Sequence, residues 1–187
     1  MRSRKRIKVI SLSVGVLIAA LVAVLATRHS VSEGAQVKSD LGGKTAPNIS
    51  GADILGGKSL SLYAMLNGNR YVLVDFFASW CTTCQQDMAQ LEDFSFHDAK
   101  KVSVLGVDIE DTAANGASFL RSYGATWPAV EDTQGANSTA VAYGVSSPPE
   151  MFLIGPNRKV LAYFVGGATD AQLNTALQDV MRAYPHL

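Results

Sequence analysis

Short apolar runs alternate with helical stretches along most of the chain. Residues 71–77 and 102–107 are nearly continuous apolar runs of strand length. Between them, in residues 81–96, large apolar residues recur every three positions, as on one face of a helix. A strand, a helix and a strand in this order predict a right-handed crossover, and hence a parallel strand pair.

The same patterns predict shorter elements on both sides of this unit. Glycine and asparagine break residues 48–69 into pieces that predict a small hairpin and one helical turn. Thr169 and Gln172 fit a capping box at the start of a closing helix. The other predicted elements are a helix at 112–123, a short strand at 129–130, a short helix at 137–143, strands at 151–154 and 159–165 joined by a turn, and the closing helix at 169–184.

A basic segment leads into an apolar run at residues 9–26, which at about 1.5 Å per residue is close to the length that spans a membrane. The flanking positive charges place the N-terminus in the cytoplasm, and the rest of the chain outside. Two interpretations stay open, a retained signal anchor, which the apolar length favours, and a signal peptide cleaved after 24–26. We therefore divide the chain into a basic end with an anchor (1–27), a flexible polar tether (28–45) and a folded domain (46–187).

Composition and charge narrow the class of protein. Of 187 residues, 48% are hydrophobic, which is ample for a folded core. The formal net charge is zero, but six of the sixteen basic residues precede residue 29 and no acidic residue does. The remainder is mildly acidic and has no basic stripe, which argues against nucleic acid as a partner.

Both cysteines, Cys81 and Cys84, follow the first strand in a Cys-x-x-Cys spacing at the expected start of a helix. Unpaired N–H groups and the helix dipole stabilise a thiolate there, so we expect an outward-facing Cys81 to be the nucleophile and a shielded Cys84 to resolve the mixed disulfide. The alternatives are a zinc site and an inert structural bridge. Zinc requires about four N or S ligands, whereas no histidine lies within ten residues of the pair. So short a loop would stabilise the fold little as a structural bridge.

Three segments carry a family resemblance. Residues 46–48 (Ala-Pro-Asn), 77–84 (Phe-Ala-Ser-Trp-Cys-Thr-Thr-Cys) and 143–154 (beginning Tyr-Gly-Val) resemble, in order, the domain entry, the active-site segment and the YGV-x-x-x-PETFLI stretch of the TlpA-like family. These are membrane-anchored, extracytoplasmic thioredoxin-like proteins. The resemblance implies an α/β thioredoxin-like fold with a central mixed sheet flanked by helices, here with an N-terminal hairpin extension and an N-terminal transmembrane anchor.

The resemblance also implies roles for residues near the cysteines. Pro149 matches a cis-proline that packs beside the dithiol and offers its backbone to an extended substrate. The preceding Pro148 lacks an N–H, so we expect weaker or differently registered peptide docking than in relatives. Glu150 matches the glutamate of the family's Pro-Glu pair, and we expect it to be a solvated surface charge at the rim. Trp80 is expected to cover the dithiol and offer an apolar contact to a partner, or to be a core residue.

Two acids complete the candidate site. Asp75 lies inside the apolar strand, where burial should raise its pKa and let it relay a proton for Cys84, unless it turns toward solvent or a hydrogen-bond partner. Asp87 lies three residues after Cys84, where reductases of the family often have glutamate. It disfavours the thiolate or, alternatively, serves the helix dipole. Ala89 replaces a proline that usually kinks this helix in relatives.

Together these features predict a thiol–disulfide oxidoreductase that reduces exported proteins such as apocytochrome c, with no cofactor and no metal. Its partners would be a disulfide-containing exported protein and a membrane donor that transfers thiol electrons. A dithiol oxidase and a non-catalytic tethered chaperone or copper-handling module remain as alternatives.

Overall fold

The computed structural model describes residues 35–36, 39–68, 70–133 and 135–186. Within these residues no helix combines the length and the apolar character needed to cross a membrane. The predicted anchor at residues 9–26 lies outside the described residues. The chain divides into residues 1–33 and a unit that begins at residue 34, and the description below concerns the second unit.

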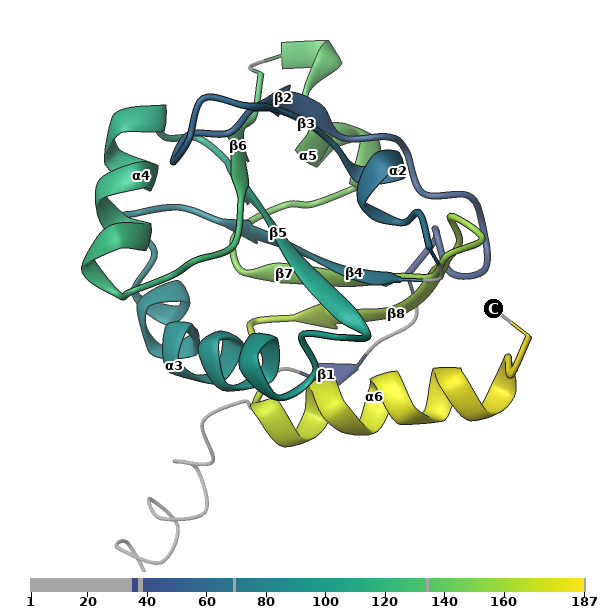
Figure 1. Ribbon diagram of the computed structural model, residues 1–187. Coiled ribbons are helices and arrows are strands. Elements are labelled where there is room, and N and C mark those ends of the chain that lie inside the picture. The colour runs from purple at the N-terminus through teal and green to yellow at the C-terminus, as the bar shows by residue number, and fades with distance from the viewer. Residues whose placement is uncertain (1–34, 37–38, 69, 134, 187) are drawn as a thin grey trace, which may run out of the picture. The chain divides into compact units, whose positions relative to one another are not determined.

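The described unit alternates strands and helices (Figure 1). Its strands are β1 (Ala35–Gln36), β2 (Ser50–Ala52), β3 (Ser59–Ser61), β4 (Tyr71–Phe77), β5 (Val102–Asp108), β6 (Ala129–Glu131), β7 (Glu150–Ile154) and β8 (Val160–Val165). Its helices are α2 (Leu62–Met65), α3 (Thr82–His97), α4 (Ala113–Ser122), the 3-10 helix η1 (Gly135–Asn137), α5 (Thr139–Tyr143) and α6 (Asp170–Ala183). Every element that the apolar pattern predicts is present.

Six strands form one mixed sheet in the order β1-β8-β7-β4-β5-β6. β4 pairs parallel with β5, and β5 parallel with β6, whereas β7 is antiparallel to both β4 and β8. The predicted crossover through α3 is therefore confirmed, as is the antiparallel hairpin of β7 and β8. β2 and β3 form the separate predicted hairpin. This is the predicted thioredoxin-like arrangement.

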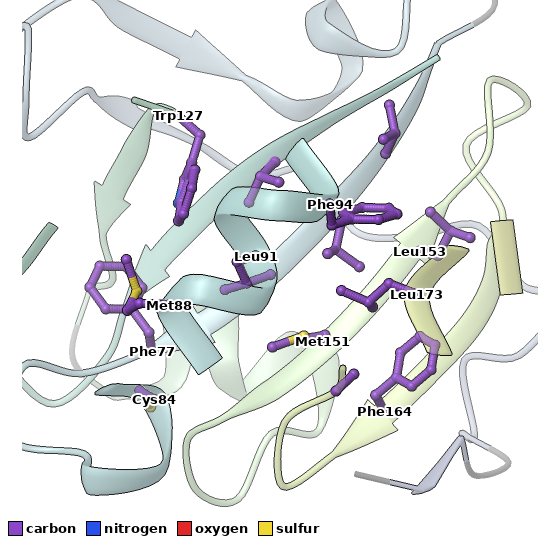
Figure 2. Packing of buried hydrophobic residues seen from close by; sticks show 14 of the residues in the cluster. Phe77, Cys84, Met88, Leu91, Phe94, Trp127, Met151, Leu153, Phe164 and Leu173 are labelled. Atoms are coloured by element: carbon purple, nitrogen blue, oxygen red, sulfur yellow. The ribbon is translucent and has the colours of Figure 1, made fainter. Parts of the chain in front are cut away.

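Two layers of apolar side chains cover the two faces of the sheet. On one face α3 and α6 pack against the strands, and Figure 2 shows Met88 of α3 beside Phe77 of β4, in the same cluster as Met151 of β7 and Leu173 of α6. On the other face the segment 46–66 and α5 cover β4, β5 and β7. All seven residues of β4 are buried, because this central strand has a neighbour on each side and a layer on each face.

Part of the stretch for which we predict a flexible tether is paired with the body of the fold. β1 is antiparallel to β8. Gly42 and Thr45 form single bridges with Val160 and Lys159, and Gly43 N donates to Val160 O at 2.9 Å. These contacts cover the outer edge of β8, which would otherwise present unpaired backbone groups.

Local signals fix the starts of two helices that matter for the site. Thr169 and Gln172 form the predicted capping box of α6. Cys81 is the N-cap of α3, and the helix then runs sixteen residues through Ala89, where relatives have proline. The chain therefore leaves the carboxyl end of β4 and, after a short loop, places Cys81 at the N-cap and Cys84 in the first turn of α3.

Candidate active site

Cys81 and Cys84 form a disulfide, with their Cα atoms 5.2 Å apart. The N–H of Cys84 donates to Cys81 Sγ at 3.0 Å, and the N–H of Cys81 donates to Ala78 O at 3.1 Å. Cys81 thus occupies the N-cap, where its sulfur faces a free N–H group of the first helical turn. An N–H group and a helix dipole directed at sulfur favour the thiolate once the pair is reduced.

The outward-facing position that we expect for Cys81 is wrong for this oxidised form. Cys81 is 5% exposed and Cys84 3% exposed, so the two residues are almost equally buried. Both belong to the same cluster as Phe77 and Met88. The disulfide holds Cys81 close to Cys84, and hence against this cluster.

Trp80, by contrast, is a surface residue. It is 54% exposed, so the alternative of a core tryptophan is wrong. Its indole N–H donates to the carbonyl oxygen of Glu110 at 3.2 Å. The ring is therefore held at one end while much of its apolar surface stays open to a partner.

The peptide bond between Pro148 and Pro149 is cis, as the resemblance implies. Pro149 is buried, and its carbonyl oxygen accepts a 2.9 Å hydrogen bond from Gly166 N. Because neither proline has an N–H, Pro148 O is the backbone group of this pair left to meet an extended peptide. That Pro148 O binds the backbone of a substrate stays a prediction.

Glu150 is not the solvated surface charge that we expect from the sequence. It is 2% exposed, and its Oε1 accepts from Ser146 N at 3.0 Å, from Ser146 Oγ at 3.3 Å and from Ser147 N at 3.4 Å. Its Oε2 accepts from the hydroxyl of Tyr163. Burial, and then the bond to Glu150, hold the pKa of Tyr163 above its usual value, so the phenol remains a donor. Glu150 therefore ties the residues before the cis bond to β8.

Asp75 lies in the core, on the central strand that leads to the cysteine pair. It is 3% exposed, and its neighbours at alternate positions on β4, Leu73 and Phe77, belong to the same cluster as Cys84. Burial, and then the charge of Asp87, raise the pKa of Asp75 to about 8. Its Oδ1 is buried and has no hydrogen-bond partner among the described residues. Of the two orientations that the sequence leaves open, the structure shows the buried one.

Asp87 lies one helical turn beyond Cys84, close enough to Asp75 for their charges to interact. Burial raises its pKa to about 7, and its Oδ2 is buried without a hydrogen-bond partner in the part of the chain that the structure describes. The carboxylate packs directly on Gly167, where an added Cβ would lie 1.9 Å from Oδ2. The side chain therefore points toward the loop between β8 and α6.

Sequence reasoning missed the turn that follows β5. Asp111 Oδ2 accepts from Ser79 N at 2.8 Å, and the adjacent Glu110 is the residue that binds Trp80. These contacts join positions about thirty residues apart, so the local pattern of apolar and polar residues does not predict them. A usable signal is the register of parallel strands, since β4 and β5 end side by side with Phe77 opposite Asp108.

A cavity of about 320 Å³ borders this turn. Its lining includes Ile109, Glu110, Val141, Val145 and Ser146. It therefore lies between the turn that holds Trp80 and the segment that Glu150 ties to the cis-proline. Within the described ranges, no group of three or more His, Cys, Asp or Glu side chains is arranged to hold a metal ion.

A Cys-x-x-Cys disulfide at the start of a helix, a cis-proline directly before β7 and a buried acid on the central strand β4 together define a thioredoxin-like thiol–disulfide exchange protein. Comparison with known sequences gives the family. The chain belongs to the Redoxin family, whose sequence pattern matches residues 41–178.

Named relatives agree with this class. The chain is 29% identical over 153 residues to the thiol-disulfide oxidoreductase ResA of Bacillus subtilis, covering 81% of this chain and 78% of that protein. It is 32% identical over 125 residues to the thiol:disulfide interchange protein DsbE homolog of Paracoccus denitrificans, covering 66% of each. A solved thiol-disulfide oxidoreductase from Bacteroides fragilis matches with a TM-score of 0.63 and 28% identity, over 73% of this chain and 99% of that one. The protein is an enzyme, a thiol–disulfide oxidoreductase that acts on disulfide-containing substrates.

Proposed function

We propose that the enzyme works as a reductase of disulfides in exported proteins, with apocytochrome c as a candidate substrate. The direction of electron transfer is argued from the two acids Asp75 and Asp87, whose pKa values are raised by burial. A dithiol protein becomes a strong oxidant when its reduced form is specially stabilised as a thiolate. The buried surroundings that keep Asp75 largely protonated also disfavour a thiolate at the cysteine pair, and ionised Asp87 opposes it by its charge, which favours a reductant.

The proposed reaction begins with the reduced enzyme. The Cys81 thiolate attacks one sulfur of the substrate disulfide, forms a mixed disulfide and releases the other substrate sulfur as a thiolate, which takes a proton. Cys84 then loses its proton to a neighbouring carboxylate and attacks Cys81 Sγ. The products are the Cys81–Cys84 disulfide and a fully reduced substrate, so two electrons pass from enzyme to substrate.

Asp75 and Asp87 suit the proton transfer. Their pKa values of about 8 and about 7 lie near neutrality, where one group can both accept and return a proton. Asp75 is the deeper of the two, and we assign the proton of Cys84 to it first. Asp87 is half-buried and provides the next carboxyl toward solvent.

The proposed location is the outer side of the membrane, with the chain anchored through residues 9–26. Support comes from the basic and apolar order of the N-terminus and from the TlpA-like motifs. An anchored reductase needs a renewed supply of electrons, for which we propose a membrane protein that transfers them from thiols. Trp80 and the cavity beside it offer the contact surface for substrate.

Two measurements test the proposal. Equilibration of the purified protein with glutathione gives the reduction potential of Cys81–Cys84: a value near about −270 mV supports a reductant, and a value near about −120 mV would establish the oxidase. A Cys84→Ser variant expressed in cells keeps the mixed disulfide on Cys81. Recovery of exported proteins, apocytochrome c among them, identifies the substrates, and recovery of cytoplasmic proteins alone would refute the location.

A further inference from the structure

The turn between β5 and α4 meets the segment that immediately precedes the nucleophile. Asp111 Oδ2 accepts from the backbone N–H of Ser79 at 2.8 Å, and Glu110 O accepts from the indole N–H of Trp80 at 3.2 Å. Two consecutive residues of the turn therefore hold two consecutive residues of the catalytic loop. The next residue in the chain is Cys81.

The turn is itself firmly fixed. Glu110 adopts φ 51°, a left-handed conformation that residues other than glycine rarely take. Asp111 Oδ1 accepts from Thr112 N at 2.8 Å and from Asn115 Nδ2 at 3.0 Å. Partial burial acts to raise the pKa of Asp111, but the hydrogen bonds from Ser79, Thr112 and Asn115 outweigh it, so its pKa lies below the usual value. The carboxylate is therefore charged throughout the neutral range.

Capping of α4 does not account for this arrangement. Thr112 is the N-cap, and its side chain accepts from Asn115 N at 3.3 Å. Glu131 adds another carboxylate, which accepts from Ala113 N at 3.1 Å. Of Thr112, Glu131 and Asp111, it is Asp111 that accepts the hydrogen bond from Ser79 N. Glu131 of β6 is therefore a matched control. Its carboxylate also accepts from the start of α4, and among the described residues it forms no hydrogen bond with the catalytic loop.

We propose that Asp111, with Glu110, is a positioning element that holds Ser79 and Trp80 so that Cys81 stays at the N-cap of α3. Cys81 there receives the N–H of Cys84, and the helix dipole stabilises its thiolate. If the Ser79 contact is lost, the loop shifts and Cys81 leaves this position for part of the time. The thiolate population and the reactivity of Cys81 then fall. The inference concerns Cys81 whichever way electrons flow, so it does not rest on the proposed reductase direction.

The sign of the effect separates positioning from simple electrostatics. A negative charge near a thiol disfavours the thiolate, so removal of the Asp111 charge alone would make Cys81 react faster. Loss of positioning makes it react slower. The two mechanisms therefore predict opposite changes for the same substitution.

The test uses purified, reduced full-length protein and iodoacetamide at pH 7, with alkylation of Cys81 followed by mass spectrometry. Asp111→Ala is expected to slow Cys81 at least threefold, whereas Glu131→Ala leaves the rate within about 1.5-fold of wild type. Both variants should lower the midpoint of thermal unfolding, Asp111→Ala by more, because the carboxylate of Asp111 accepts three hydrogen bonds and that of Glu131 accepts one from the start of α4.

Asp111→Glu covers the case in which Asp111→Ala fails to fold. It keeps the charge and moves the acceptors by one methylene, so slowing in this variant reports position alone. An unchanged or faster Cys81 in either Asp111 variant, or equal slowing in Glu131→Ala, would overturn the inference. None of these results depends on the reduction potential, which tests the direction of transfer separately.

Discussion

Replacing the buried acid Asp75 with asparagine should change both the stability and the catalysis of the enzyme. Asp75 is 3% exposed, and its pKa rises from 3.8 to about 8 on folding. The folded protein therefore holds a proton that the unfolded chain releases above about pH 4. The contribution of Asp75 to the free energy of unfolding is therefore fully present below pH 3.8 and is lost as the pH rises toward 8.

The size of the effect follows from linkage. Between about pH 5 and pH 7 the folded state keeps its proton while the unfolded state is ionised, so the free energy of unfolding falls by about 1.4 kcal/mol per pH unit. Asp75→Asn carries no proton to lose. Across these two pH units the variant should gain about 3 kcal/mol relative to wild type.

Denaturant unfolding of the oxidised protein at several pH values measures this slope, and Asp108→Asn is the matched control. Asp108 is 1% exposed, and burial, followed by the charges of Asp111 and Glu131, raises its pKa to about 8 as well. Asp108 is the last residue of β5, and its carboxyl packs against Gly116 of α4. Both variants should therefore show the same gain with pH.

The rate of disulfide reduction distinguishes Asp75 from Asp108. Single-turnover reduction of a peptide disulfide should slow at least tenfold in Asp75→Asn, because general-base transfer contributes about 100-fold or more. It should be unchanged in Asp108→Asn. A wild-type slope retained in Asp75→Asn would refute the raised pKa, and an unchanged rate and pH profile would refute the proton relay.

Two further substitutions test the groups around the dithiol. Gly167→Ala places a methyl group against the carboxylate of Asp87 at a φ of 89°, whereas Gly43→Ala meets no atom within 4 Å at a φ of 73°. Denaturant unfolding should show a loss of about 1 kcal/mol for Gly43→Ala and at least about 1 kcal/mol more for Gly167→Ala, and equal losses would contradict the contact with Asp87. Tyr163→Phe removes the donor to Oε2 of the buried Glu150, so the free energy of unfolding should fall by about 1–3 kcal/mol. An unchanged value would show that water or another donor replaces the phenol.

Local chemistry was enough to predict the elements and the reacting atoms. The nearly continuous apolar run from 71 to 77, the capping box at Thr169 and the Cys-x-x-Cys spacing each depend on residues a few positions apart, so they can be recognised directly in the sequence. The mixed sheet followed from the order of these elements, because crossover handedness leaves few alternatives. The cis bond before Pro149 followed from the family motif.

Tertiary packing decided how the site is supported. Glu150 was misread as a surface charge because its donors, Ser146 and Tyr163, are brought together only by the loop and the neighbouring strand. Cys81 was expected to face outward, yet the disulfide holds it in the core cluster.

The sequence by itself determined which residues react, through the spacing of Cys81 and Cys84 and the strand before them. The tertiary structure decided which residues hold them in place and which buried acids interact through their charges. The Asp111 contact with Ser79 and the interaction of Asp75 with Asp87 join separate elements. Such contacts depend on strand register and helix docking, which arise from the packing of the whole core and leave no periodic trace in the chain.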